Sequence, residues 1–191
     1  KTVLSGGAWS SSSPINTARN ATCATGVQTA SLIMGGKTSP PTNSTEVEQY
    51  NGTGWSNETV IPTATRQACG AGTTTAALFA AGFNSPPIGQ AAAYEYDGSS
   101  WTVTGSMGHG RTSATSAGTQ TAALIAGGTQ ATSPNPSNRT ELYNGSTWSD
   151  GPTLGTARYQ LMGSNVGIQT ATLCIGGYQG PPGARTEVES Y

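Results

Sequence analysis

The sequence predicts an all-β fold, a β-propeller of four repeated blades, on three observations. Charged residues make up only 9% of the 191 residues, and glycines number 27. Runs of strand-forming residues alternate with turn-forming residues, and long runs of helix formers are absent. The third observation is a repeat of 46 or 47 residues marked by four tryptophans: Trp9, Trp55, Trp101 and Trp148. A period of this length is typical of propeller blades.

Two other residue types keep nearly the same period. The tyrosines Tyr50, Tyr96, Tyr143 and Tyr191 are spaced by 46, 47 and 48 residues. The arginines Arg19, Arg66, Arg111 and Arg158 are spaced by 47, 45 and 47 residues. Aligned on these anchors, each repeat starts at an arginine and contains four short antiparallel strands.

The first two strands of each repeat are joined at a glycine. These glycines are Gly26, Gly72, Gly118 and Gly167, and three of the four turns read Gly-x-Gln-Thr-Ala. The apolar strand that follows is predicted over 30–34, 76–80, 122–126 and 171–175. A continuous apolar run ended by glycine indicates a strand buried on both faces. Gly-Gly or Ala-Gly ends each one, where a side chain would crowd the backbone.

The third and fourth strands form a hairpin. An alternating segment such as 45–50 predicts the third strand, and the tryptophan segment predicts the fourth. The turns between them are Asn51-Gly52, Asp97-Gly98 and Asn144-Gly145. Asn-Gly and Asp-Gly favour the two positive φ angles of a type I′ turn, so we expect that turn here.

The glycine pair after an apolar strand, the Glu-x-Tyr-Asn-Gly-x-x-Trp segment and the arginine before the next repeat together resemble kelch repeats. The resemblance covers essentially the whole chain. The second repeat departs from it, with Ala81-Gly82 and Tyr94 where the others have Gly-Gly and Glu. Low-charge, Thr/Gly-rich repeats of this style resemble those of bacteriophage and marine bacterial surface proteins. Kelch-type rings usually contain more than four blades.

We expect one domain over 1–191, with repeat units at about 11–56, 57–102, 103–149 and 150–191 plus 1–10. The last unit ends where its fourth strand should begin, and residues 5–10 resemble such a strand. Pairing of this N-terminal strand with the strand that ends at Tyr191 would close four four-stranded blades into a ring and hide two sheet edges. The alternative is that these four blades are part of a six- or seven-bladed propeller.

Composition argues against several functional classes. A net charge of −1 with eight basic residues lacks the clustered footprint of a nucleic-acid-binding protein. The apolar runs are too short to span a bilayer, so no membrane insertion is expected. Cys23, Cys69 and Cys174 have no metal-ligand spacing, and we interpret them as small buried hydrophobes. No cofactor and no metal are expected.

Catalysis is not expected either. The single histidine, His109, lies in a glycine-rich loop and lacks the partners of a catalytic triad or a copper centre. The recurring Glu48, Glu141 and Glu189 are spread one per repeat, whereas a catalytic carboxylate pair must lie close together. We interpret these glutamates as structural partners of arginine or of backbone groups between blades. The protein is therefore expected not to be an enzyme.

Ligand-binding candidates gather on one predicted face. Strand alternation places the loops between second and third strands on the same face as the arginines. The candidates are the following: Arg19, Arg66, Arg111, Arg158, Lys37, Phe83 and Tyr178. A ring of guanidinium groups could hold a carboxylate, a sulfate or an acidic sugar, or each arginine could instead pair with a glutamate of a neighbouring blade. Prolines in the same loops would either stiffen a binding face or protect sheet edges.

Two functions remain compatible with these observations. The first is a non-catalytic, lectin-like module, extracellular or on a virion, that binds a glycan or another surface ligand. The second is a structural module that packs against protein partners of an extracellular or phage assembly. The fold alone does not decide between them. The sequence does not set the oligomeric state.

Overall fold

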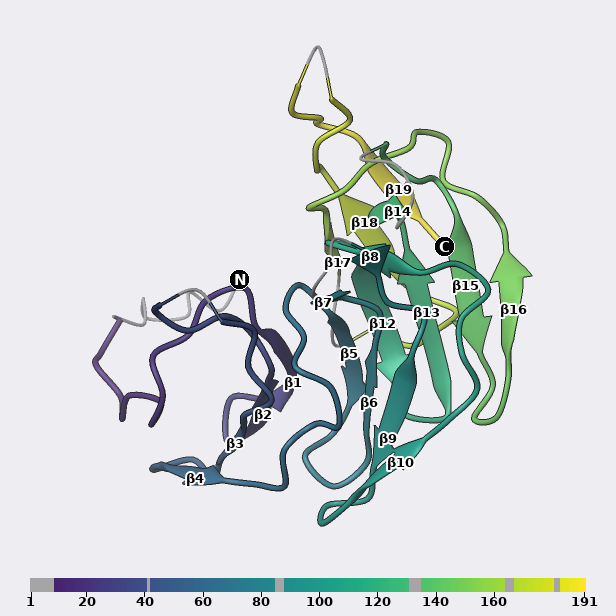
Figure 1. The fold of residues 1–191 in the computed structure, drawn as a ribbon. Coiled ribbons are helices and arrows are strands. Elements are labelled where there is room, and N and C mark those ends of the chain that lie inside the picture. The colour runs from purple at the N-terminus through teal and green to yellow at the C-terminus, as the bar shows by residue number, and fades with distance from the viewer. Residues whose placement is uncertain (1–8, 41, 85–87, 131–134, 164–166, 181–182) are drawn as a thin grey trace, which may run out of the picture.

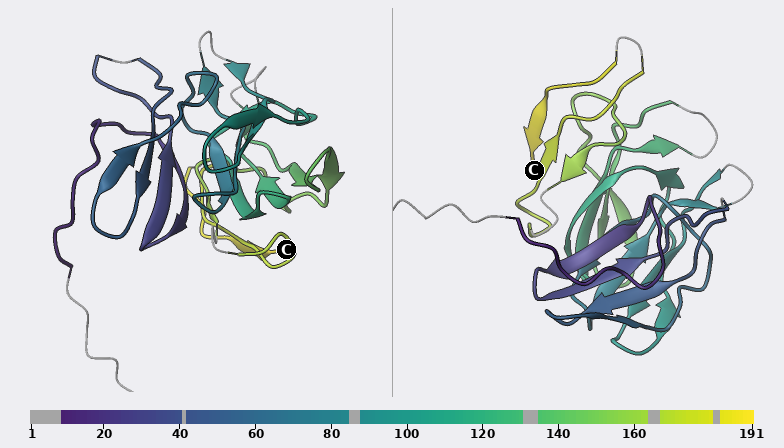
Figure 2. Two further views of the ribbon diagram at one scale, coloured as in Figure 1. Left: turned by 90° about the horizontal axis from the view of Figure 1, so that it is seen from below. Right: turned by 90° about the vertical axis from the view of Figure 1, so that its left-hand side faces the viewer.

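We describe the fold from a computed structural model of the chain, which describes residues 9–40, 42–84, 88–130, 135–163, 167–180 and 183–191. All regular structure in these residues is β, which confirms the predicted fold class. Four small antiparallel sheets follow one another in chain order, from the purple first sheet to the yellow last one (Figures 1 and 2). None of the described residues forms a helix that could span a membrane.

The first three sheets have four strands each, and each forms one propeller blade. The first blade contains β1 (Cys23–Val27), β2 (Ala30–Met34), β3 (Val47–Tyr50) and β4 (Trp55–Asn57). The second contains β5 (Cys69–Gly72), β6 (Ala77–Ala80), β9 (Ala93–Tyr96) and β10 (Trp101–Val103). The third contains β12 (Thr115–Thr119), β13 (Ala122–Ala126), β15 (Thr140–Tyr143) and β16 (Trp148–Gly151).

The fourth blade has three strands, which are β17 (Met162–Gly163), β18 (Leu173–Ile175) and β19 (Val188–Ser190). The expected fourth strand, over 5–10, is not seen in the described part of the chain. Residues 5–8 lie outside the described residues, and Trp9 and Ser10 belong to no strand. The side chain of Trp9 is fully exposed instead of packing on β19.

Short accessory strands lie in the loops on one side of the blades. They are β7 (Phe83–Asn84) with β8 (Ile88–Gly89), and β11 (Arg111–Thr112) with β14 (Thr129–Gln130). The loop prolines singled out from the sequence fall mostly outside the described residues.

The core lies between successive blades. The face of each sheet that is turned toward the next blade is called here the forward face, and the opposite one the rear face. Leu32 and Met34 on the forward face of the first blade pack against Phe79 and Tyr96 on the rear face of the second. The same contact recurs between the second and third blades and between the third and fourth. Burial of these apolar faces is the main force that holds the array together.

The inner strands surround a small central cavity of about 190 Å³, lined by residues near Cys23, Cys69, Thr115 and Met162. Next to it, main-chain hydrogen bonds connect the blades in series. Gln67 donates to Ala21, Ser113 to Gln67 and Gln160 to Ser113, over 2.8, 3.1 and 2.8 Å. All four residues have a positive φ near 55°, which fixes the sharp bend where each linker becomes an inner strand.

The hairpin turns differ from the expected type I′ geometry. Four residues separate Tyr50 from its partner Trp55, and only Gly52 of the Asn51-Gly52 pair has a positive φ. The Asn51 side chain instead accepts main-chain hydrogen bonds from Thr53 and Gly54 over 3.0 and 2.9 Å. Asp97 and Asn144 do the same in their turns. The side chain thus stabilises the turn as an acceptor and not through its own positive φ.

Candidate functional site

Three of the four recurring arginines have buried guanidinium groups that form ion pairs with glutamate. Arg19 pairs with Glu48 at 2.7 Å and Arg158 with Glu189 at 2.5 Å, and Arg111 pairs with Glu141. Each guanidinium also donates to three main-chain carbonyls, which for Arg19 are those of Thr17, Gly35 and Glu46. The partner glutamate belongs to the blade that the arginine precedes, not to a neighbouring blade as expected. These guanidinium groups hold each linker against its own sheet.

The glutamate of each pair also accepts main-chain N–H groups of the linker. Glu141 accepts from Gly108 and His109, over 2.6 and 3.2 Å. Glu48 accepts from Asn16 and Thr17 in the same way, over 2.5 and 3.2 Å. A buried carboxylate that receives several donors has its charge compensated, which is what such burial requires. His109 is therefore part of a structural loop through its backbone.

Arg66 does not occupy the position of the other arginines, contrary to the regular spacing assumed from the sequence. The main-chain oxygen of Thr65 accepts from Gly36, as that of Arg111 accepts from Gly82 and that of Arg158 from Gly128. Thr65 is therefore the structural equivalent of Arg111, and Arg66 lies one residue further on. In an extended segment a shift of one residue turns the side chain to the other side.

The second blade lacks the whole ion-pair arrangement. Tyr94, opposite Phe79, holds the register position that Glu141 holds opposite Ile125. Pro62 follows Ile61 as Gly108 follows Met107, and a proline has no N–H to donate to a carboxylate. The Tyr94 hydroxyl shares a hydrogen bond of 3.0 Å with Thr63 instead.

Arg66 is thereby placed on the loop face of the molecule, in the position of Asn20, Thr112 and Tyr159. Each of these four residues pairs across the backbone with the residue that follows a glycine: Asn20 with Lys37, Arg66 with Phe83, Thr112 with Thr129, and Tyr159 with Tyr178. The backbone arrangement repeats, whereas the side chains of the four pairs all differ. Positions that vary on a constant framework are where a repeat protein can build a specific site.

The Arg66–Phe83 pair lines a surface hollow of about 610 Å³ together with Thr42, Asn43, Thr63, Ala64 and Asn84. The guanidinium carbon of Arg66 lies 4.2 Å from the centre of the Phe83 ring, a cation–π contact. One guanidinium nitrogen donates to the Asn43 side-chain oxygen over 3.2 Å, and the Asn43 amide donates to the Phe83 carbonyl over 3.2 Å. We call these residues the Arg66 groove.

The electrostatics of the Arg66 groove are set by this cation. In the described part of the chain Arg66 forms no ion pair, and its remaining N–H donors have no partner. The ring and the amide hold the guanidinium in one orientation, so its free edge can bind a planar anion such as a carboxylate through two parallel hydrogen bonds. Asn84 is fixed by the Gln90 amide, which donates to its side-chain oxygen over 2.6 Å.

The other candidates on this face lie outside the groove. Lys37 pairs through its backbone with Asn20 and Asn43, one strand away from Arg66. Tyr178 stacks edge-on against Tyr159 in the fourth blade, with ring centres 5.3 Å apart. Asn43, Thr63 and Asn84 were not identified from the sequence. The replacement of glutamate by Tyr94 was the available signal, because it removes the buried anion that an arginine would need.

The cysteines behave as small buried hydrophobes. All three are free and buried, and burial raises the pKa of each thiol, that of Cys69 to about 12. A thiol of such high pKa is a poor nucleophile and a poor metal ligand at neutral pH. Among the described residues no three His, Cys, Asp or Glu side chains gather as a metal site would require.

By its sequence the chain matches no protein-family profile and no curated protein. By its fold it is similar to a solved structure described as the structure of YjhT, with a TM-score of 0.74 and 13% sequence identity. The match covers 92% of this chain and 67% of that one. At this identity the similarity shows the propeller fold alone.

Proposed function

We propose that the protein is a non-catalytic binding module that recognises acidic glycans through the Arg66 groove. The observation that carries this proposal is the half-buried Arg66–Phe83 pair, which lines an open hollow at a position where each of the other blades has a different pair of side chains. Ion pairs with glutamate fix the other three recurring arginines, so Arg66 is the one of these four that is offered to a ligand. An aromatic ring, two amides and hydroxyl groups around a fixed cation match the chemistry of a uronic or sialic acid.

The resemblance of the repeats to kelch repeats supports a module of this kind. Within the proposal, the low charge and Thr/Gly-rich loops suit a protein displayed outside a cell or on a virion. The described residues offer no catalytic pair: Glu48, Glu141 and Glu189 are each engaged with an arginine, and the His109 backbone donates to Glu141. Binding without turnover is the role for which this arrangement is suited.

The test is a glycan array that contains acidic and neutral oligosaccharides, probed with three proteins. These are the wild type, Arg66→Ala, and the matched control Thr112→Ala, which changes the equivalent residue of the third blade. We expect the wild type and Thr112→Ala to bind uronate- or sialate-containing glycans. Arg66→Ala should lose at least about tenfold in affinity, as expected for the loss of a charge-assisted contact.

Circular dichroism of each variant checks that the fold is intact. Equal binding by all three proteins would place the ligand elsewhere. A blank array for a folded wild type would favour the alternative function, a structural module that packs against protein partners.

A further inference from the structure

The forward face of the fourth blade is apolar but uncovered. Ile175 pairs with Met162 and Val188, as Met34 pairs with Cys23 and Val47 in the first blade. The side chains of Met162, Ile175 and Val188 are 67%, 43% and 57% exposed, whereas Met34 and Val47 are fully buried. The forward face of the fourth blade thus has the apolar residues of a face that packs against a next blade, but none of the described blades packs on it.

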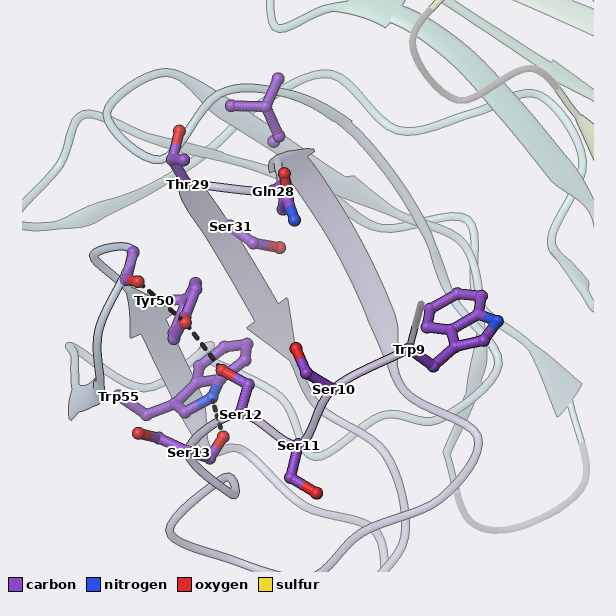
Figure 3. A pocket seen from close by; sticks show the side chains of 13 residues that line it. Trp9, Ser10, Ser11, Ser12, Ser13, Gln28, Thr29, Ser31, Tyr50 and Trp55 are labelled. Carbon is purple, nitrogen blue, oxygen red and sulfur yellow. Dashed lines mark hydrogen bonds between the residues drawn. The ribbon is translucent and has the colours of Figure 1, made fainter. Parts of the chain in front are cut away.

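The rear face of the first blade is the complementary surface. Its Ser31 and Tyr50 hold the positions of Ala77 and Tyr96, which are fully buried under the first blade. Here they line an open hollow of about 990 Å³ instead. Figure 3 shows that Tyr50 and Trp55 are partly covered by Ser12 and Ser13, whereas Trp9 stands apart. The Trp55 indole donates to the Ser13 carbonyl over 3.1 Å.

A glutamine on this rear face lacks the contact that its equivalents make. Gln120 donates to the Ala77 and Tyr96 carbonyls of the preceding blade over 3.2 and 2.8 Å. Gln169 reaches the corresponding carbonyls of the third blade over 2.7 and 2.8 Å. Gln28 has the same place in the Gly-x-Gln-Thr-Ala turn but is exposed and lines the hollow. By register its acceptors are the main-chain oxygens of Thr172 and Tyr191, on the fourth blade.

Within the described part of the chain the two surfaces do not meet. The series of main-chain bonds from Ala21 through Gln67 and Ser113 ends at Gln160. Among the described residues no bond returns from Ala21 to Gln160. The exposure of the Ile175 and Val188 side chains agrees with this, because none of the four described blades covers this face.

We propose that the forward face of the fourth blade binds the rear face of the first blade of a second copy of this chain. The interface would repeat the blade contact seen three times inside the chain. It would include hydrogen bonds from the Gln28 side-chain amide to main-chain oxygens of the fourth blade of the other copy. Because the two faces differ, each contact is heterologous. Two copies form a dimer with twofold symmetry when the forward face of each copy binds the rear face of the other.

The test is a complementation experiment by analytical ultracentrifugation. Ile175→Glu blocks the forward face, and Ser31→Glu blocks the rear face. Val103→Glu is the matched control, because Val103 is 71% exposed on β10 and belongs to neither face. The wild type and Val103→Glu should sediment as dimers, and each blocked variant as a monomer with association weakened at least about tenfold.

An equimolar mixture of the two blocked variants should form one-to-one dimers, because it contains one intact forward face and one intact rear face. Gln28→Ala should weaken the wild-type dimer several-fold. A wild type that stays monomeric at all concentrations would overturn the proposal. This includes a monomer in which another part of the same chain covers Ile175. Dimers that persist in both blocked variants would overturn it as well.

Discussion

The second and third blades are built from the same repeat but fix their linkers differently. The third blade uses the buried pair of Arg111 and Glu141, and the linker backbone donates to the same carboxylate. The second blade has Thr65, Tyr94 and Pro62 in the corresponding places, with one hydroxyl hydrogen bond. The arginine, the glutamate and the N–H donor of the linker are therefore all replaced together in the second blade. The neighbouring Arg66 has no glutamate partner there and can bind a ligand at the surface.

The largest effect is expected from breaking the pair in the third blade. Both side chains are 1% exposed or less, so Glu141→Gln leaves the Arg111 charge buried without its counter-ion. The free energy of unfolding should fall by about 3–5 kcal/mol. Urea denaturation measures it, with Tyr94→Phe as the control at the equivalent position. A loss below that of Tyr94→Phe would contradict a stabilising role for this pair.

Introducing an arginine–glutamate pair into the second blade tests the comparison directly. Tyr94→Glu alone should cost about 3 kcal/mol or more, because it buries a carboxylate without a partner. Adding Thr65→Arg supplies the guanidinium and should return about 1–3 kcal/mol of coupling energy in a double-mutant cycle. Recovery stays incomplete because Pro62 has no N–H to donate. Additive effects of the two changes would show that Thr65 is not the equivalent of Arg111.

A smaller effect is expected from Tyr94→Phe itself. It removes the hydroxyl that Thr63 shares at 3.0 Å and leaves the ring packed against Phe79, with ring centres 6.4 Å apart. The loss should be about 1 kcal/mol, the usual size for one neutral hydrogen bond. Thermal unfolding measures it. A loss as large as that of Glu141→Gln would mean that Tyr94 does more than replace a carboxylate.

The hairpin turns of the two blades should differ in their response to acid. Main-chain and hydroxyl hydrogen bonds from Ser100 and Ser99 hold the pKa of Asp97 well below its usual range, whereas the third blade has the non-titrating Asn144 there. The stability that Asp97 contributes is therefore present above the unfolded pKa of about 3.9 and is lost as the pH falls toward the folded pKa. An NMR titration of the Asp97 carboxyl should give a midpoint below 3.9. A midpoint at or above it would show that the turn does not hold the charged form.

The smallest difference between the second and third blades lies in their inner strands, where a cysteine of one replaces a threonine of the other. Cys69 of the second blade faces Ala80 as Thr115 of the third faces Ala126. Burial raises the pKa of Cys69 to about 12, so it should not react with a thiol reagent at pH 8 until the protein unfolds. Rapid labelling of Cys69 in the folded protein would contradict its burial.

The sequence predicted most of the framework because framework residues recur. Trp101, Tyr96 and Gly118 each have an equivalent in other repeats, and together they set the strand order, the turns and the number of sheets. The expected closing strand over 5–10 lies mostly outside the described residues, and its described residues Trp9 and Ser10 belong to no strand. Strand-like residues alone do not specify the sheet edge with which they pair. Register and pairing depend on the burial of whole faces, which a segment by itself does not reveal.

The site was predicted only in part. Arg66 and Phe83 were both expected on the loop face, but Arg66 was grouped with arginines that are buried. Arg66 follows Arg19 by 47 residues and precedes Arg111 by 45, which indicates that Arg66 lies one residue beyond the regular arginine position. Only the structure showed that this shift of one residue turns the Arg66 side chain outward. Asn43 and Asn84 come from two different blades, so no local pattern connects them to Arg66.

The central claim is that the Arg66 groove binds an acidic glycan. The most direct measurement is an NMR titration of the labelled protein with oligogalacturonate, with the neutral oligosaccharide maltohexaose as control. We predict saturable shifts of the Arg66, Asn43 and Asn84 side-chain signals with oligogalacturonate only, and their disappearance in Arg66→Ala. Shifts that survive this substitution, or that appear equally with maltohexaose, would contradict the claim.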